Sequence, residues 1–268
     1  MKLSPTELLQ IAHDELRNVG KLKGETVIGI STDSRTIKEG ELFVAIRGSN
    51  FDGHKFLAEA FANGAVAAVV DREGAIEPVK TMPLLVVHDT TKALGDLARY
   101  YRLKFDIPVI AIGGSNGKTT TKEMIASVLR RRYEVLSTEG NLNNQIGVPH
   151  TLFRLERKHE LAVIEIGTNH PGEIAYLCSV IEPTHGLITN IGREHLEFFR
   201  TLRGVAKEEG ALFEALARRN DAVAFVNVDD PLLRQRARNL RKKVTYGCTS
   251  TASIRGKIGD ADASGVCL

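Results

Sequence analysis

Glycine, lysine and threonine occur near the middle of the chain in an order that can bind phosphate. The segment reads Gly114-Ser-Asn-Gly117-Lys118-Thr119. Its glycines let the backbone approach an anion closely, Lys118 supplies a positive charge, and the Thr119 hydroxyl can hold Mg²⁺. The strict eight-residue phosphate loop has glycine where Ile112 stands, so the match is to the shorter form. We predict that a nucleotide triphosphate binds Gly114, Ser115, Asn116, Gly117, Lys118, Thr119 and Thr120.

The segments on either side of this loop support the prediction. Residues 107 to 112 form a short β-branched, apolar run that predicts a buried strand. After the loop, apolar residues return at helical spacing: Met124, Ile125, Val128 and Leu129. The N-terminus of such a helix adds unpaired N–H groups and a partial positive charge. The alternative, a glycine-rich turn that ends a strand and exposes a lysine, does not require this strand-loop-helix order.

A carboxylate and an imidazole follow two later predicted strands. Glu165 ends the apolar run 161 to 164, and a carboxylate there is costly unless it is paired or binds a metal. We therefore predict a Mg²⁺ ligand, the alternative being a buried Glu bonded by backbone donors. His195 follows another strand end but indicates little as an isolated residue. After a third strand, Asp230 is a typical helix N-cap, which leaves Asn227 and Asp229 for a ligand.

Three other polar stretches leave two interpretations open. The loop 139 to 149 is dense in amides, which can orient phosphate, carboxylate or peptide groups but also form plain turns. Residues 31 to 35 and 47 to 54 each combine hydroxyl, carboxylate and cation after a predicted strand. Local evidence favours turn-forming and capping roles for Asp33, Ser34 and Arg35 and for Asp52, Gly53 and His54.

Strands and helices alternate along most of the chain. We expect an opening helix at 5–17, strands at 27–30, 42–46, 65–70 and 84–87, and helices at 54–63 and 89–104. Beyond the phosphate loop, strands are expected at 134–136, 161–166, 186–189, 222–226 and 244–246, with helices at 174–181, 205–217 and 232–240. This pattern predicts an α/β protein: a small N-terminal α/β domain, residues 1–87, and a mostly parallel-sheet P-loop domain, residues 88–268.

Composition is that of an ordinary globular protein. The 268 residues are 43% hydrophobic and 26% charged, and the net charge of +3 is too weak to indicate a nucleic-acid partner. No apolar run approaches the ~18 residues of a membrane-spanning helix, and the N-terminus turns polar too early for a secretory signal. Three cysteines without metal or redox spacing fit a reducing compartment. We expect a cytoplasmic monomer that does not insert into a membrane.

Seven ordered motifs together resemble the Mur ligase family. They are Ser31-Thr-Asp-Ser-Arg35, Phe51-Asp-Gly-His54, the phosphate loop, Gly140-Asn-Leu-Asn-Asn-Gln-Ile-Gly-Val-Pro149, Ile164-Glu-Ile-Gly-Thr-Asn-His-Pro-Gly-Glu173, Asn190-Ile-Gly-Arg-Glu-His-Leu-Glu197 and Asn227-Val-Asp-Asp-Pro231. The amide loop and the Asn-His-Pro-Gly-Glu run most resemble the members that add D-Ala-D-Ala to UDP-N-acetylmuramoyl-tripeptide. The resemblance implies an ATP-dependent amide ligase of peptidoglycan synthesis that forms an acyl phosphate, with ATP and Mg²⁺ as cofactors.

The same resemblance implies roles for individual residues. Thr119 and Glu165 would hold one Mg²⁺, His195 would serve a second, and Asn227 would lie by the adenine; Lys118, Glu165, His195 and Glu209 would form the catalytic set. The UDP-sugar would bind a set of residues drawn from the polar loops: Ser34, Arg35, Arg47, Gly48, Asp52, Gly53, His54, Asn143 and Asn144.

Two departures from the family pattern matter. Members usually carry a carbamoylated lysine four residues before an aromatic residue, and counting back from Phe213 gives Glu209 at that position. We expect Glu209 to replace the lysine, and Lys207 is the competing candidate. The plain alternative is that Glu209 is a solvated residue on a helix face. The sequence also stops at Leu268, without the family's third domain. We therefore expect weak or no ligase activity from this chain alone.

Other functions stay open at this stage. The chain could be an inactive nucleotide and UDP-sugar binding module, which phosphate release with both substrates present would exclude. It could be another ligase of the family that acts on folate, cyanophycin or a different muropeptide, although the loop 140 to 149 argues against that. A P-loop kinase or GTPase would leave the first domain unexplained.

Overall fold

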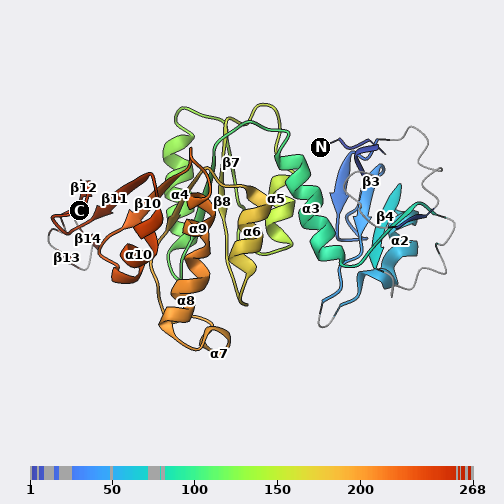
Figure 1. The fold of residues 1–268 in the computed structure, drawn as a ribbon. Coiled ribbons are helices and arrows are strands. Elements are labelled where there is room, and N and C mark those ends of the chain that lie inside the picture. Colours follow the sequence, from blue (N-terminus) through green and yellow to red (C-terminus); the bar gives the residue numbers. More distant parts are fainter. Residues whose placement is uncertain are drawn as a thin grey trace. The chain divides into compact units, whose positions relative to one another are not determined.

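The computed structural model describes residues 2–4, 6–8, 15–17, 26–48, 51–71, 79, 82–257, 259, 261–262 and 265–266. It divides into two compact units: Met1–Phe105 with Leu152–Glu156, and Asp106–Thr151 with Arg157–Leu268 (Figure 1). The first unit includes the connecting helix that we assigned to the second domain. The boundary between domains near residue 88 stays a prediction.

The first unit is built on a five-stranded sheet with the order β1-β5-β4-β3-β2. Four strands run parallel, and β1 pairs antiparallel with β5 at the edge. The strands are β1 Glu15–Arg17, β2 Gly29–Ser31, β3 Glu41–Val44, β4 Ala67–Asp71 and β5 Leu84–Val87. Apolar strand residues such as Phe43, Val70 and Val86 form the core of the unit. The four parallel strands lie where the sequence predicted them, to within two residues.

The helices of this unit are η2 Gly53–Phe56, α2 Leu57–Ala62 and α3 Thr90–Arg102, the last capped by Asp89. The predicted helix 5–17 is wrong at its end, because Glu15–Arg17 is a strand. Pairing with β5, which makes β1 the edge strand of the sheet, overrides the local helical pattern there. Residues 6–8 are helical, and residues 5 and 9–14 lie outside the described part of the chain.

The second unit contains a seven-stranded, all-parallel sheet with the order β12-β11-β10-β9-β6-β8-β7. Its strands are β6 Val109–Gly113, β7 Val135–Ser137, β8 Leu161–Glu165, β9 His185–Ile188, β10 Val223–Asn227, β11 Lys243–Gly247 and β12 Ile254–Arg255. The α/β class and the parallel sheet are confirmed. A short antiparallel pair follows, β13 Ala261–Asp262 with β14 Gly265–Val266.

The strand order explains where a ligand can bind. After β6 the chain builds β7 and β8 on one side and then β9 to β12 on the other. Ile112 is in register with Glu165 of β8, and Gly113 is in register with Ile188 of β9. The phosphate loop therefore leaves the sheet between the carboxyl ends of two neighbours, at the point where strand order reverses and where ligands of open α/β sheets bind.

Helices connect these strands. They are α4 Lys118–Leu129, α5 Gly147–Leu152, α6 Glu173–Ile181, α7 Leu196–Phe199, α8 Leu202–Glu209, α9 Ala211–Ala217, α10 Pro231–Arg236 and η4 Ala237–Asn239. The predicted helix 205–217 is therefore two helices that meet at Gly210. A Cβ on Gly210 would lie 2.9 Å from the Arg236 side chain, so glycine allows α10 to pack closely here. Within the described part of the chain, every helix is too short or too polar to span a membrane.

The helix after the phosphate loop uses its residues differently from the prediction. Ile125 and Leu129 pack against the sheet core, as expected. Met124 and Val128 are instead 65% and 71% exposed, whereas Lys122 is completely buried. The predicted apolar face is thus wrong for two of its four residues, because α4 turns a lysine toward the interior.

Candidate functional site

The phosphate loop joins β6 to α4 through two glycines with positive φ. Gly114 has φ +114°, and a Cβ there would lie 2.3 Å from the Thr189 hydroxyl, so a side chain is excluded. Gly117 has φ +76° and begins α4 without a side-chain cap. The first N–H groups of α4 consequently stay open to an anion. Lys118 Nζ donates to the Gly114 carbonyl over 2.6 Å, which folds its charge back over the loop.

The segment after β9 holds the loop in place. The Thr189 hydroxyl and the Asn190 amide both donate to the Asn116 carbonyl, at 2.7 and 3.0 Å. Ser115 N–H donates to the Asn190 carbonyl, and the Ser115 hydroxyl donates to Glu194 Oε1 over 2.6 Å. The motif around residue 190 therefore supports the loop, a role that its sequence did not reveal.

His195 follows Glu194 in this segment with φ +45°, an uncommon value for a residue with a side chain. Its ring lies 3.8 Å from Glu197 and edge-on to Phe199. No hydrogen bond or ion pair among the described residues joins His195 to Lys118 or Glu165. Its metal role stays a prediction.

Glu165 is 2% exposed at the end of β8. Its Oε1 accepts from the Asn143 amide over 2.8 Å, and its own N–H donates to the Thr138 hydroxyl over 3.0 Å. Its Oε2 is buried and has no hydrogen-bond partner among the described residues. The alternative of a Glu satisfied by backbone donors does not describe this carboxylate, since one oxygen has an amide partner and the other has none.

Glu209, at the end of α8, is completely buried against the loop. Its Oε2 accepts from Gly114 N–H over 2.6 Å, and its Oε1 has no partner among the described residues. Burial raises the pKa of Glu209 to about 7, opposed by the Lys118 charge and assisted by Glu194. Lys207, by contrast, is exposed. The structure thus brings the first of our two candidates to the loop and leaves the second in solvent.

Three residues near this site were not singled out in the sequence. Lys122 Nζ donates to the Thr138 carbonyl over 2.7 Å, so Thr138 links α4 to Glu165. Glu208 accepts from Gly172 N–H and Ile174 N–H, at 2.8 and 2.9 Å, and so supports the start of α6. Lys122 shares the buried face of α4 with residue 126, a spacing that could have indicated its burial.

The donors near the loop suit a hard cation. No group of three or more His, Cys, Asp or Glu side chains in the described ranges is spaced to hold a metal ion by itself. Glu165 Oε2 is nonetheless a buried oxygen without a partner, and the Thr119 hydroxyl is exposed in the first turn of α4. Mg²⁺ takes one or two protein oxygens and completes its shell with phosphate and water, so these residues fit it.

The loop between β10 and α10 is largely occupied by internal bonds. Asp230 caps α10, as predicted, and also accepts from Ile191 N–H over 2.9 Å. The Asp229 carboxylate accepts from Cys248 N–H and Thr249 N–H, which lowers its pKa. Asn227 donates to the Thr189 carbonyl over 3.3 Å, which places it beside the segment that holds the phosphate loop.

The amide loop supports the same edge of the sheet. Asn143 donates to Glu165, as described above, and its carbonyl accepts from Gly167 N–H over 2.8 Å. Asn144 Oδ1 accepts from Ile146 N–H and Gly147 N–H, at 3.0 and 2.8 Å, and so caps α5. Both side chains therefore have positioning roles, and their contact with a UDP-sugar stays a prediction.

In the first unit, Arg47, Asp52 and His54 form a polar network with Asp71. His54 is 2% exposed; its Nδ1 lies 2.7 Å from Asp52, and its Nε2 accepts from Asp71 N–H over 3.0 Å. This acceptor role leaves the proton on Nδ1, where it is donated to Asp52. Arg47 lies 3.3 Å from Asp71 and 3.8 Å from Asp52. A Cβ on Gly53 would lie 2.9 Å from backbone atoms of residue 46, so this loop packs tightly.

The turn after β2 is held mainly by bonds between residues close in sequence. Arg35 donates two bonds to Asp33, at 2.9 and 2.7 Å, and this guanidinium lowers the pKa of Asp33 to about 2. Ser34 is 5% exposed, and its carbonyl accepts from the Asn63 amide. These contacts give the turn a structural explanation that requires no ligand.

Both units match domain models of one protein family. Residues 112–266 match the Mur ligase middle domain, and residues 26–102 match the domain described as Mur ligase family, catalytic domain. The chain belongs to the Mur ligase family. The resemblance of the seven motifs is confirmed at this level.

Individual relatives within the family share one name. Proteins named UDP-N-acetylmuramoyl-tripeptide--D-alanyl-D-alanine ligase are 42% identical over 233 residues in Haemophilus influenzae and 43% identical over 213 residues in Escherichia coli. These matches cover 85% and 79% of this chain and 49% and 46% of the relatives. The chain therefore spans about half the length of the curated Mur ligases that it matches.

Solved Mur ligase structures agree. MurF from Acinetobacter baumannii superposes with a TM-score of 0.82 at 35% identity, covering 92% of this chain and 54% of that protein. MurF from Thermotoga maritima, solved in complex with ADP, gives 0.77 at 31% identity over 86% of this chain and 52% of that protein.

Proposed function

We propose that this chain forms part of an ATP-dependent amide ligase that joins D-Ala-D-Ala to UDP-N-acetylmuramoyl-tripeptide in peptidoglycan synthesis. The observation that carries the proposal is the phosphate loop, which is flanked by Glu165 with its unpartnered buried oxygen. The names of the relatives support the substrates, and the ADP complex of one relative supports the nucleotide. We place the reaction in the cytoplasm, where ATP is available and free thiols such as the exposed Cys248 stay reduced.

In the proposed reaction, the γ-phosphoryl group of ATP passes to the terminal carboxylate of the tripeptide. The amine of D-Ala-D-Ala then attacks the acyl phosphate, so the amide bond forms as phosphate leaves. The carboxylate and the triphosphate repel each other; Lys118 and the open N–H groups of α4 would offset that repulsion. Mg²⁺, when bound, would neutralise phosphate charge, held by Thr119 and Glu165 and, at a second position, by His195.

Glu209 would supply a carboxylate in place of the carbamoylated lysine of other members. Its burial against Gly114 and the exposure of Lys207 support this assignment. The proposal predicts that Glu209→Ala abolishes turnover and that bicarbonate does not restore it. Lys207→Ala is the matched control and should retain activity; a bicarbonate-dependent loss in the control would transfer the role to Lys207.

The first unit would bind the uridine diphosphate end of the substrate through Ser34, Arg35 and the loop 47–54. The Arg47 guanidinium is 39% exposed beside buried His54, so a phosphate could reach it without disturbing the network. Asn227 would lie by the adenine of ATP, beside the segment that holds the phosphate loop.

Two measurements test the proposed function. Calorimetry should show Mg²⁺-dependent ATP binding that Lys118→Ala weakens by about 100-fold, because charged phosphate contacts at a loop are strong. Phosphate release, which we expect to be weak for this chain alone, should require the tripeptide substrate and D-Ala-D-Ala together. Release with a different amine would indicate another ligase of the family, and ATP binding without release under any substrate combination would indicate a binding module.

A further inference from the structure

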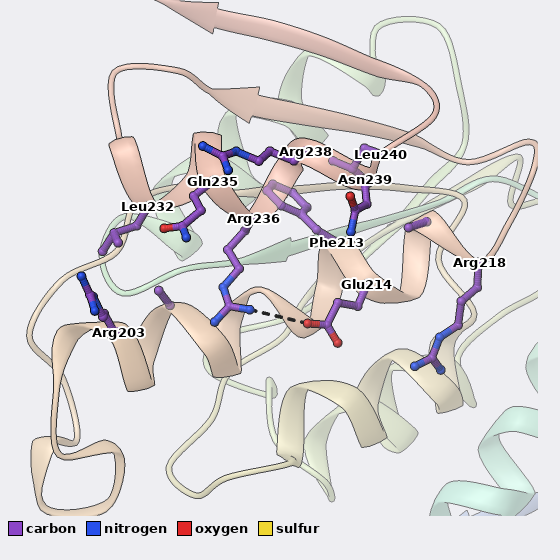
Figure 2. Close-up of a pocket in the computed structure, with 12 residues that line it drawn as sticks. Arg203, Phe213, Glu214, Arg218, Leu232, Gln235, Arg236, Arg238, Asn239 and Leu240 are labelled. Carbon is purple, nitrogen blue, oxygen red and sulfur yellow. Dashed lines mark ion pairs between the residues drawn. The ribbon is translucent and has the colours of Figure 1, made fainter.

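A hollow of about 710 Å³ lies on the helical side of the second unit, between the α8–α9 helices and the α10–η4 segment (Figure 2). We call it the arginine groove and define it by Arg203, Arg218, Arg236 and Arg238, which line it together with Glu214. We propose that the arginine groove binds a small anion that carries two or three phosphate groups. It shares no lining residue with the phosphate loop, so it would be a second site.

The positive charge of the groove is poorly balanced by the protein. Glu214 is the single acid in the lining, it is 57% exposed, and it lies 3.7 Å from Arg236. In Figure 2 the guanidinium groups of Arg203, Arg218 and Arg238 lie apart from this pair. The side chains of Arg203, Arg218 and Arg238 form no ion pair or hydrogen bond with another residue of the described ranges.

Elsewhere in the same unit a half-exposed arginine is paired. Arg219 donates to both oxygens of Asp221, at 3.2 and 2.9 Å, and lies 3.7 Å from Glu182. The amide side chains of Gln235 and Asn239, which also line the groove, have no partner among the described residues either. The groove thus gathers donor groups that the protein leaves available for an acceptor.

Helix dipoles explain only part of this arrangement. Arg218 caps the C-terminus of α9 and Arg236 lies in the last turn of α10, positions where a cation is favoured. Arg203 is the second residue of α8, however, and a cation in the first turn of a helix is disfavoured. Its place in the groove therefore needs another reason, and a bound anion supplies one.

The shape and chemistry of the groove favour phosphate. Guanidinium groups present paired N–H donors that match phosphate oxygens, and several of them can bind several phosphates. Behind the arginines lie Phe213, 1% exposed, and Leu240, 8% exposed, which give the hollow an apolar floor. The volume falls in the range of small-molecule sites, about 300–1,000 Å³. A phosphorylated metabolite could place its phosphates on the arginines and its remaining atoms on this floor.

A neighbouring depression extends the positive surface. It has a volume of about 480 Å³ and is lined by Pro231, Arg234, Gln235 and Arg238, so it shares two residues with the groove. Arg238 stands between the two hollows and should contact phosphates in either one.

The test uses inorganic triphosphate as the probe and the whole 268-residue chain carrying Lys118→Ala, which weakens the phosphate loop. Calorimetry should still detect one binding site. Adding Arg203→Gln or Arg236→Gln should weaken that site about tenfold each, as expected for a lost hydrogen bond between charged groups. The matched control is Arg131→Gln, which removes an exposed arginine after α4 and should change affinity less than about twofold.

Three results would overturn the proposal. The first is that the Lys118→Ala chain binds no triphosphate. The second is that the control Arg131→Gln weakens binding as much as Arg203→Gln and Arg236→Gln do, which would indicate attraction to net charge alone. Citrate, which carries carboxylates and no phosphate, could bind as tightly as triphosphate and exclude a phosphate site. Melting temperatures of all variants should agree within about 2 °C, so that lost binding is not lost folding.

Discussion

Polar residues follow parallel strands in both units, but they are satisfied in different ways. In the loop 47–54, both ring nitrogens of His54 have partners, and Arg47 lies between two carboxylates. At the carboxyl edge of the large sheet, Glu165 and Glu209 each have one buried oxygen without a partner among the described residues. A network in which each polar group has a partner indicates a structural role. A buried polar atom without a partner is costly, and it indicates a site that a ligand completes.

Glu209→Gln should give the largest effect, because it removes a buried charge. The folded-state pKa of about 7 lies above the ordinary value of 4.5, so Glu209 costs nothing below pH ~4.5, and stability falls as pH rises toward 7. The variant should exceed the parent in unfolding free energy by about 3 kcal/mol at pH 8 and match it near pH 4. Urea unfolding between pH 4 and 8 measures the difference.

Exposed Glu214 is the matched control for that series. Glu214→Gln should change the unfolding free energy at pH 8 much less than Glu209→Gln does, because its carboxylate is exposed. A Glu209→Gln curve that stays parallel to the parent at every pH would contradict the raised pKa.

His54→Phe tests the polar network of the first unit. The substitution removes the acceptor of Asp71 N–H and a donor to Asp52, which should lower the unfolding free energy by about 2 kcal/mol. ATP affinity should not change, since the phosphate loop lies in the other unit. Thermal unfolding and calorimetry measure the two quantities. His54→Gln keeps a polar side chain and should recover part of the loss; equal losses in both variants would show that ring packing, not hydrogen bonding, holds the loop.

Thr138→Val tests how Glu165 is positioned. The change keeps the shape of the side chain and removes the acceptor of Glu165 N–H, at an expected cost of about 1.5 kcal/mol. If Glu165 holds Mg²⁺, ATP affinity should fall with Mg²⁺ present and stay constant without it. Thr138→Ser retains the hydroxyl and should behave as the parent. A loss of stability without any Mg²⁺-dependent effect would leave Thr138 a purely structural residue.

Arg35→Ala should have the smallest effect on folding. Its partner Asp33 lies two residues away, and such surface pairs contribute little. The melting temperature should stay within about 1 °C of the parent. Affinity for the UDP-linked substrate separates the two interpretations of this turn: a clear loss with unchanged melting would assign Arg35 to binding, and no loss would leave it a turn residue.

The features that the sequence predicted correctly are those that depend on a local residue pattern. Apolar runs located the parallel strands, and the strand-loop-helix order located the phosphate loop, because both signals occupy contiguous residues. Glu165 was recognisable since a carboxylate among apolar residues is unusual. Asp230 was identified as a cap from its position before proline.

Other features depend on contacts between distant residues and left little local signal. The buried Lys122 donates to the Thr138 carbonyl, and Gly210, where α8 and α9 meet, lies against the side chain of Arg236 from α10. The strand at 15–17 forms through pairing with β5. The arginine groove gathers residues from α8, α9, α10 and η4, and sequence spacing does not show that their donors lack partners.

The central position of β6 has a consequence for synthesis on the ribosome. The phosphate-binding residues are made early, but β9 follows about 70 residues later and Glu209 lies 95 residues beyond Gly114. A nascent chain that has emerged only to α6 carries every glycine of the loop and lacks the Thr189 and Glu209 contacts that shape it. Nucleotide capture should therefore begin abruptly, once α8 has docked, and a ligand present during translation would favour late intermediates over early ones.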